Sequence, residues 1–224
     1  MPRTLAPLVS DDIPSLAERA YERLREAIVD GTLPSGRKLS ERSLAAALAI
    51  SAQPVREALR RLEGEGLVES RPRSGTFVAA LDDARLIQMG RMRAALEGVA
   101  AGLVARQATP ETIAALRARL EAIRAATALD DPARLAEAND AFHLALHAIT
   151  GNALLMRTLR ALRAYHHISR VRVLAARDQR DRALEEHATV LARIEAGDAA
   201  GAEALMRAHA LRSLNVAFPE AGMS

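Results

Sequence analysis

The stretch Leu39–Val78, LSERSLAAALAISAQPVREALRRLEGEGLVESRPRSGTFV, decides the fold of the N-terminal part of this chain. It opens with a short helical pattern over 40–48, for which Ser40 is suited as the N-cap. A second helical pattern begins after Ser51 and runs to about Glu65, with Pro54 in its first turn, where a missing N–H costs little. The inner stripe of this helix is formed by apolar residues at helical spacing, Val55, Leu59 and Leu62.

The end of this stretch carries the only convincing strand signal in the sequence. In GLVESRPRSGTFVAAL, residues 66–81, two short β-prone runs flank a turn-rich middle that contains Pro72 and Gly75. The β-prone residues are Val68, Thr76, Phe77 and Val78. The pattern predicts a small β-hairpin.

A further helix is predicted before the stretch, over 15–30, with apolar residues at helical spacing and a stop at Gly31 and Pro34. Three helices followed by a two-stranded hairpin is the order of a winged helix-turn-helix. In that arrangement the third helix enters the major groove of DNA by its N-terminal end, where free N–H groups meet phosphate. The hairpin can touch the neighbouring minor groove or the backbone.

The composition fits a folded protein without disulfides. The chain has 224 residues, half of them hydrophobic, which is enough for two modest domains. It has no cysteine, which excludes disulfides and thiolate metal sites. Neither a signal-peptide pattern nor an apolar run of membrane-spanning length is present, so we expect a cytoplasmic protein that does not contact the membrane.

The charged residues are unevenly placed along the chain. The net charge is only +3, and Lys38 is the single lysine among 31 basic residues. A GC-rich genome would give the same arginine bias. Residues 37–80, however, hold eight basic residues against five acidic ones, which hints at a nucleic-acid partner.

Residues 15–80 resemble the GntR family of bacterial transcription regulators. The strongest anchors are Ser40-Glu41, Leu44, Ala45, Leu48, Ser51, Pro54 to Leu59, Leu62, Gly66 to Val68 and Gly75 to Val78. The resemblance implies that the DNA contacts come from Arg42, Arg56 and the residues that open the third helix, Ser51 and Gln53. It places Arg73 and Gly75 at the tip of the wing.

Two positions depart from the family pattern. The family often has Arg where this chain has Ala52 and Thr where it has Gln53, so the operator sequence is expected to differ from the common one, with Gln53 able to bind an adenine. Other readings of the arginines stay open. Arg42 could pair with a glutamate, and Arg60 and Arg61 suit the solvated surface or phosphate contacts better than base contacts.

The C-terminal part reads as helix throughout. Helix-terminating residues, namely proline, glycine, asparagine and aspartate, divide it into six or seven predicted helices, at 83–107, 110–127, 132–150, 152–164, 165–176, 179–196 and 198–217. The expected fold class is therefore mainly α, with a winged helix-turn-helix followed by an antiparallel all-α bundle. We place the domain boundary between 1–80 and 81–224.

Three histidines lie on the apolar faces of three separate predicted helices. His143 follows Asn139 by one turn within ANDAFHLALH, and His187 and His209 occupy similar positions further on. A lone histidine on such a face is usually a satisfied core residue. Three of them in one bundle favour a metal site, because neutral imidazole binds Zn²⁺, Ni²⁺ and similar ions.

The order and spacing of these residues resemble the FCD effector domain of FadR-type GntR regulators. The resemblance covers about 85–217 and rests on RAALEGVAAGLVARQAT from Arg93, NDAFHLALHAITGN from Asn139 and EHATVLARIEAGD from Glu186. It implies that a divalent metal, Zn or Ni, is held by four side chains, Asn139, His143, His187 and His209. It also implies that a small carboxylate effector fills the open positions of the metal and that Arg93 binds a second carboxylate, although a surface position for Arg93 is an equal alternative.

Several residues near the four proposed ligands have other expected roles. The neutral oxygen of Asn139 is a weaker ligand than a carboxylate, and Asp140 is a possible substitute at a poorer helical angle. Glu186 is expected to point away from the pocket. His147, His166 and His167 stay unassigned, with surface or interface positions favoured.

The expected function is a ligand-responsive transcription regulator, favoured as a repressor, and not an enzyme. A homodimer would read an operator with two-fold symmetry and bind a small carboxylic acid. The alternatives are a metal sensor, a regulator that binds an acyl-CoA or larger acid without metal, a metal-dependent hydrolase with a DNA-binding appendage, and a purely architectural DNA binder. The sequence leaves the effector, the metal, the operator, the regulated genes and the sign of regulation open.

Overall fold

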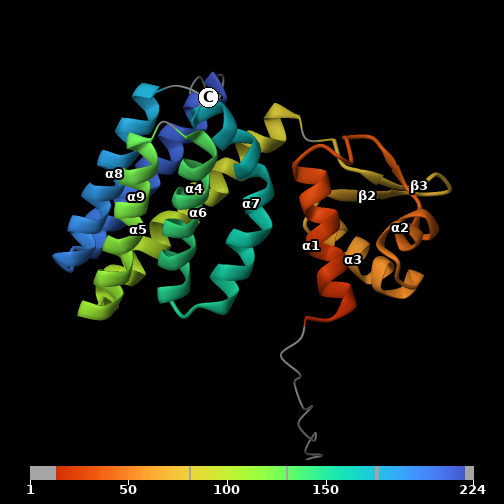
Figure 1. Cartoon of the computed structure of the whole chain (residues 1–224), viewed down its shortest axis with the longest axis horizontal. Helices are drawn as coiled ribbons and strands as arrows, with labels where there is room; N and C mark the ends of the chain where they lie inside the picture. Colours follow the sequence, from red (N-terminus) through yellow and green to blue (C-terminus); the bar gives the residue numbers. More distant parts are fainter. Residues whose placement is uncertain (1–13, 81, 130, 175–176, 220–224) are drawn as a thin grey trace, which may run out of the picture. The chain divides into compact units, whose positions relative to one another are not determined.

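A computed structural model describes residues 14–80, 82–129, 131–174 and 177–219, without the side chains at 163–172, 174 and 177. The chain divides into two compact units, Met1–Ala80 and Leu81–Ser224 (Figure 1). No helix in the described residues is long and apolar enough to cross a membrane. Each unit is described by itself below.

From residue 14 on, where its description begins, the N-terminal unit contains three helices, α1 (Leu16–Val29), α2 (Glu41–Leu48) and α3 (Ala52–Gly64). Side-chain caps fix where two of them begin. The hydroxyl oxygen of Ser15 accepts a hydrogen bond from the Glu18 N–H at 3.1 Å, and that of Ser40 accepts one from the Ser43 N–H at 3.3 Å. Ala49, with a left-handed φ of 53°, ends α2 and makes the sharp turn into α3.

The sheet of this unit has three strands, β1 (Lys38–Leu39), β2 (Val68–Arg71) and β3 (Gly75–Val78), in the order β1-β3-β2. Both pairings are antiparallel, and β2 and β3 form the predicted hairpin. The expectation that the hairpin holds all the strand in the chain was wrong, since β1 adds a third strand to its edge. Two residues are too few to show the alternation that identifies a strand in sequence.

The core of the N-terminal unit lies between α1, α3 and the sheet. Val55, Leu62 and Leu67 have no exposed surface. At its edge the Tyr21 hydroxyl donates to the Glu65 carboxylate at 2.9 Å. This packing holds α3 by its inner stripe and leaves its other face to the solvent.

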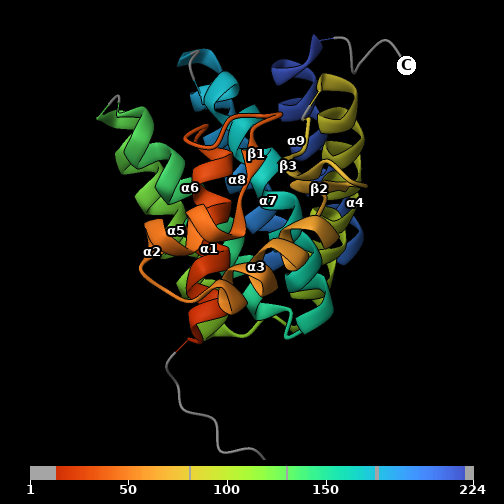
Figure 2. The same ribbon diagram turned by 90° about the vertical axis from the view of Figure 1, so that its right-hand side faces the viewer.

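The C-terminal unit contains six helices in its described residues and no strand (Figures 1 and 2). They are α4 (Asp83–Gln107), α5 (Pro110–Ala128), α6 (Pro132–Ile149), α7 (Ala153–Leu174), α8 (Arg177–Glu195) and α9 (Ala199–Ala217). The mainly α fold class is thereby confirmed. The division into 152–164 and 165–176 was wrong, because α7 continues through it; no proline or glycine lies there to end a helix.

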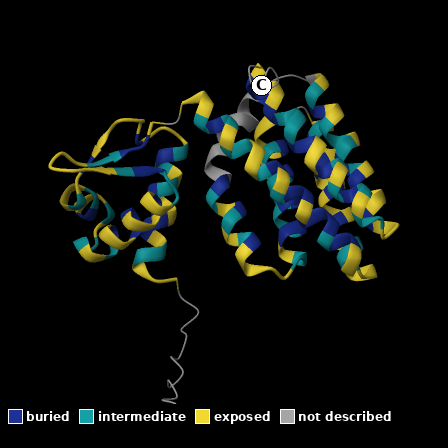
Figure 3. Cartoon of the chain, turned by 180° about the vertical axis from the view of Figure 1, so that it is seen from behind, coloured by how far each residue is buried: buried dark blue, intermediate teal, exposed yellow. Residues whose placement is uncertain are grey.

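A single apolar core runs through the C-terminal unit. Its centre includes Val104, Leu116, Phe142, Leu146 and Met206, all without exposed surface. Figure 3 shows each helix with a buried stripe toward the others and an exposed face outside. All six helices therefore direct side chains into a common interior.

Glycines let α4 and α9 approach closely along their lengths. A Cβ added at Gly98 would lie 2.9 Å from the Glu203 carbonyl oxygen and 3.1 Å from the Arg207 Cβ. The two helices lie side by side in both Figures 1 and 2. The backbone of α9 cannot yield to this contact as a flexible side chain could.

We therefore expect Gly98→Val to lower the free energy of unfolding by about 1–3 kcal/mol, because it overpacks a filled interface. Gly64→Ala is the matched control, since a Cβ there meets nothing within 4 Å, and it should stabilise by about 0.4–1 kcal/mol. Thermal melting followed by circular dichroism measures both. Equal midpoints for wild type and Gly98→Val would contradict the close α4–α9 contact.

Candidate functional site

The three histidines singled out in the sequence lie together in the interior of the C-terminal unit. His143 comes from α6, His187 from α8 and His209 from α9, and one nitrogen of each lies within 4.8 Å of those of the other two. All three are buried, with exposed fractions of 4%, 1% and 7%. The His187 ring contacts both others, at centroid distances of 5.2 Å to His143 and 4.4 Å to His209.

The Nδ1 atom of each imidazole faces a hydrogen-bond acceptor. His143 Nδ1 lies 3.0 Å from a Glu97 carboxylate oxygen, His187 Nδ1 lies 2.6 Å from the Ala183 carbonyl oxygen, and His209 Nδ1 lies 2.7 Å from a Glu186 oxygen. Because these partners accept, each Nδ1 carries the proton and donates. The three Nε2 atoms are then left with lone pairs.

Two of these lone pairs face each other. His143 Nε2 and His187 Nε2 are 3.2 Å apart, and neither has a proton to donate to the other. Two imidazole nitrogens bound to one zinc ion at ~2.0–2.1 Å lie roughly 3 Å apart. The donor set therefore fits a divalent cation, which would turn the repulsion between the lone pairs into coordination. The pattern of imidazoles held by carboxylate or carbonyl acceptors is that of metal-bound histidine.

Burial keeps two of the imidazoles neutral. It lowers the pKa of His143, although the Glu97 carboxylate opposes the change. It lowers the pKa of His187 well below its usual range, and the neighbouring His209 and His143 add to the effect. Neutral imidazole is the form that binds a metal ion.

A buried carboxylate, Glu97 of α4, supports one side of the cluster. It has no exposed surface; one oxygen accepts from Arg93 at 2.5 Å, and the other lies 3.0 Å from His143 and 2.8 Å from His147. Burial alone would raise its pKa, but the charge of Arg93 and the hydrogen bonds from His143 and His147 hold that pKa well below the usual range. Glu97 thus stays ionised and fixes the orientation of the His143 ring.

The position expected for His147 was wrong. Its side chain is buried with 7% exposed, and it donates from Nε2 to Glu97. The sequence reasoning had also missed Glu97. The available signal was spacing, because Glu97 follows Arg93 by four residues and His147 follows His143 by four, so each pair shares a helix face.

Glu186 supports the other side of the cluster, which corrects the expectation that it points away. Its carboxylate accepts from His209 at 2.7 Å and from Arg212 at 2.6 Å. Burial works to raise its pKa, but the hydrogen bonds from His209 and Arg212 lower that pKa to about 2. The side chain is long enough to cross from α8 to α9, where these partners hold it.

The fourth proposed ligand, Asn139, lies one turn before His143 on the buried face of α6, with 9% exposed. No hydrogen bond joins its amide to another residue in the described part of the chain. Asp140, which was considered as a metal ligand in place of Asn139, lines a pocket instead. His166 and His167 fall among the residues whose side chains are not described.

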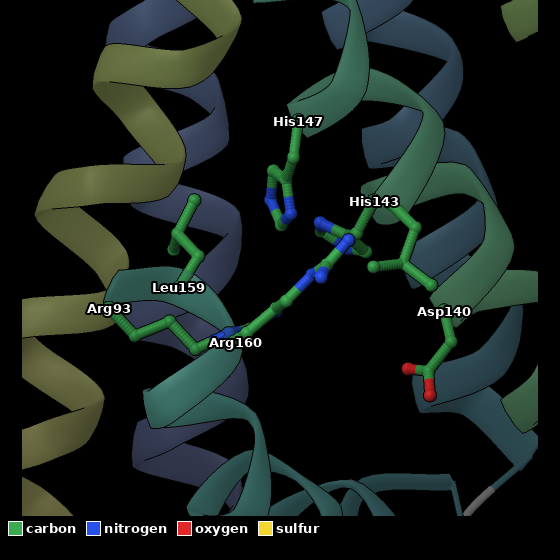
Figure 4. Close-up of a pocket in the computed structure, with 7 residues that line it drawn as sticks. Arg93, Asp140, His143, His147, Leu159 and Arg160 are labelled. Atoms are coloured by element: carbon green, nitrogen blue, oxygen red, sulfur yellow. The ribbon is translucent and has the colours of Figure 1, made fainter. Parts of the chain in front are cut away.

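That pocket opens beside the cluster (Figure 4). Its walls are Arg93, Asp140, His143, Leu144, His147, Leu159 and Arg160. Arg93 is therefore not a surface residue: its side chain is 12% exposed and is paired with Glu97. The pocket is small, about 20 Å³, and it places Arg93 and Arg160 beside His143 and His147.

In the N-terminal unit, the residues assigned to DNA all have exposed side chains or backbone. They are Arg42, Ser51, Gln53, Arg56, Arg73 and Gly75. Ser51 makes no capping hydrogen bond at the start of α3, and Gln53 donates to Glu57 at 2.9 Å. The wing turns through two left-handed residues, Arg73 with φ 61° and Gly75 with φ 107°.

Arg56 is held toward α2 by an ion pair. Its Nε and one Nη donate to the Glu41 carboxylate at 3.0 and 2.9 Å. The glutamate pairing considered for Arg42 is thus made by Arg56, and Arg42 has no ion pair with a described residue. Since a guanidinium has five N–H donors, Arg56 keeps three for another partner.

Comparison with known families matches both units. Residues 16–78 match the model described as bacterial regulatory proteins, gntR family, and residues 88–212 match that of the FCD domain. Together the two models cover most of the chain.

Named relatives and solved structures agree with this. The chain is 34% identical to a probable D-xylose utilization operon transcriptional repressor of Paenarthrobacter nicotinovorans, over 87% of this chain and 85% of that protein. It is 30% identical to a putative L-lactate dehydrogenase operon regulatory protein of Escherichia coli K12, over 87% and 83%. The structure of Escherichia coli McbR/YncC shares the fold, with TM-score 0.75 and 23% identity over 93% of this chain and 99% of that one.

Proposed function

This chain belongs to the GntR family of bacterial regulatory proteins and carries an FCD domain, and from that premise we propose a metal-dependent, carboxylate-responsive transcription regulator. The family and the relatives are DNA-binding transcription regulators and not enzymes. In the proposal, residues 1–80 read the operator, and residues 81–224 bind the effector and form a homodimer in the cytoplasm. The two winged-helix domains of a dimer suit an operator with two-fold symmetry.

The observation that carries the proposal is the convergence of three imidazoles whose Nδ1 atoms are all held by acceptors. His143, His187 and His209 would hold Zn²⁺ or Ni²⁺ through Nε2, and the Asn139 oxygen would complete the set. Such an ion, when bound, supplies a Lewis acid whose remaining positions accept a carboxylate. Glu97 and Glu186 orient the rings, while Arg93 offers N–H donors to the effector at the pocket wall.

Regulation requires that the effector favour one arrangement of the dimer's two winged-helix domains over another. We propose repression that is relieved by the effector. The relative from Paenarthrobacter nicotinovorans is named a repressor, and the Escherichia coli relative is named for the operon of an enzyme that acts on a carboxylate, L-lactate.

A metal-responsive regulator is the second candidate, and Asn139 favours it. A neutral amide in place of a carboxylate weakens the hold on a cation, and a reversible site suits sensing. In that case the metal ion alone would change the operator affinity, and no carboxylate would be needed.

Glu97→Gln tests how the site is built. Removing the charge that orients His143 should weaken metal binding about 10- to 100-fold, measured by competition with a chromogenic chelator. Glu121→Gln is the control, because Glu121 is 68% exposed on α5 and paired only with Arg124 among described residues. An unchanged metal Kd in a folded Glu97→Gln protein would show that Glu97 does not position the ligand.

A further inference from the structure

The exposed face of α3 carries two side chains suited to contact DNA bases, and a carboxylate holds each of them. Arg56 donates to Glu41 at 3.0 and 2.9 Å, and the amide nitrogen of Gln53 donates to Glu57 at 2.9 Å. Gln53, Arg56 and Glu57 are all exposed. Because Gln53 and Arg56 are three residues apart, they share one face of the helix.

The bond to Glu57 fixes which end of the Gln53 amide is held and which groups stay free. A carboxylate only accepts hydrogen bonds, so the NH₂ group of Gln53, and not its carbonyl oxygen, must face Glu57. One N–H is used in this bond, and the other N–H and the oxygen remain. One donor and one acceptor are what adenine requires, since its major-groove edge offers N7 as acceptor and the N6 amino group as donor.

The surroundings of Glu57 give its carboxylate no other partner. Arg61, four residues further along α3, is positioned for a surface ion pair with Glu57 but pairs instead with Glu18 at 2.5 Å and lies over the Tyr21 ring. No cation in the described part of the chain forms an ion pair with Glu57. An uncompensated carboxylate beside DNA repels phosphate and lowers the affinity for every duplex. What Glu57 contributes on this face is therefore the orientation of Gln53.

We propose that Glu57 is a positioning residue for base recognition, which orients the Gln53 amide so that Gln53 selects an adenine in each half of the operator. Three residues of helix rise by about 4.5 Å, close to the roughly 3.4 Å between stacked base pairs. The adenine is therefore next to the base that Arg56 contacts, or one base pair further. The inference rests on the proposed DNA-binding function and names the base and the pair of residues that selects it.

Operator selection from random duplexes, followed by competition binding, tests this with the full-length protein. Selection by the wild type and by Gln53→Ala identifies the base pair whose adenine preference depends on Gln53. Four duplexes that differ only at that base pair are then compared by fluorescence anisotropy for the wild type, Glu57→Ala and Glu57→Gln. Glu26→Gln is the control, because it removes the same charge from an exposed position on α1 of the same unit, where Arg23 is its ion-pair partner.

We expect the wild type to prefer adenine roughly tenfold over each other base, as a bidentate contact does. Glu57→Ala removes the acceptor, and Glu57→Gln also donates, so that the Gln53 amide is held in either orientation. Both variants should reduce the preference to about threefold or less and leave the preferences at other base pairs unchanged. Their affinity for an unrelated duplex should rise rather than fall, because a negative charge is gone. Glu26→Gln should keep the adenine preference.

Several results would overturn the role of Glu57. A structural role would weaken binding to all four duplexes equally and keep their ratios. Full adenine preference in both Glu57 variants, or a Gln53→Ala protein that loses no adenine preference, would also contradict it. Loss of a cytosine preference instead would make Glu57 itself the base contact. In each of these cases the protein still selects an operator and the proposed function stands. A folded wild-type protein that selects no sequence would remove the proposed function, and this inference with it.

Discussion

The His143→Ala/His187→Ala double variant should lose its bound metal completely, while wild-type protein purified without a histidine tag should carry about one Zn or Ni ion per chain. The two Nε2 atoms are 3.2 Å apart and their Nδ1 protons are committed to Glu97 and to the Ala183 carbonyl. With both removed, only His209 and the neutral Asn139 would remain of the proposed set. Two such ligands do not retain a divalent ion through purification.

Elemental analysis measures the metal content, and circular dichroism checks that the variant keeps its helices. Added metal gives a second readout. At about 100 times its Kd a metal stabilises the folded state by about 2.7 kcal/mol, so the melting temperature of the wild type should rise by several degrees and that of the variant should not. Wild-type protein that takes up no metal even after soaking would leave the histidines as core residues and would remove the metal from the account.

Arg56→Ala should remove specific operator binding without unfolding the winged helix. Arg56 is exposed on α3 and directed by Glu41, with N–H donors left for DNA. Losing an arginine that contacts a base costs about 1–3 kcal/mol, and a dimer loses two. The expected loss of affinity is therefore roughly 30-fold or more.

The measurement is fluorescence anisotropy at physiological salt on an operator selected from random duplexes by the wild-type protein. Arg119→Ala is the control, because it removes the same charge from an exposed position on α5 of the other unit. It should bind the operator as the wild type does. Equal binding by Arg56→Ala, with matched circular dichroism, would remove Arg56 from the DNA contacts.

The winged helix could be predicted from sequence because its signals are local. The cap at Ser40, Pro54 in the first turn of α3 and Gly75 after the wing turn each act on their own neighbours. The edge strand β1 escaped prediction because Lys38 and Leu39 are ordered by the partners Phe77 and Thr76, far along the chain.

The candidate metal site shows where local reasoning stops. The apolar stripes around His143, His187 and His209 predicted that they face inward, and the structure brings them together. Which groups hold their Nδ1 atoms depends on how the helices pack. Glu97 reaches His143 across 46 residues and Glu186 reaches His209 across 23, and no pattern within one helix predicts such contacts.

The surroundings of Arg93 and Arg160 were also not predicted from the sequence. The resemblance pointed to Arg93 as the effector contact, but its pairing with Glu97, four residues further along α4, was not predicted. Arg160 carries no sequence signal at all, since one exposed arginine on an arginine-rich helix looks like any other. Its place in the pocket comes from the packing of α7 beside α4 and α6.

The central claim is that the histidine site controls DNA binding, and operator affinity with and without a carboxylate tests it most directly. Metal-loaded wild-type protein is titrated onto labelled operator in the presence and absence of the tightest-binding acid, beside the His143→Ala/His187→Ala variant. We expect the acid to weaken wild-type binding about tenfold, a coupling of about 1.4 kcal/mol, and to leave the variant unchanged. An operator affinity that does not respond to the acid in the wild type, or responds equally in the variant, would contradict the account.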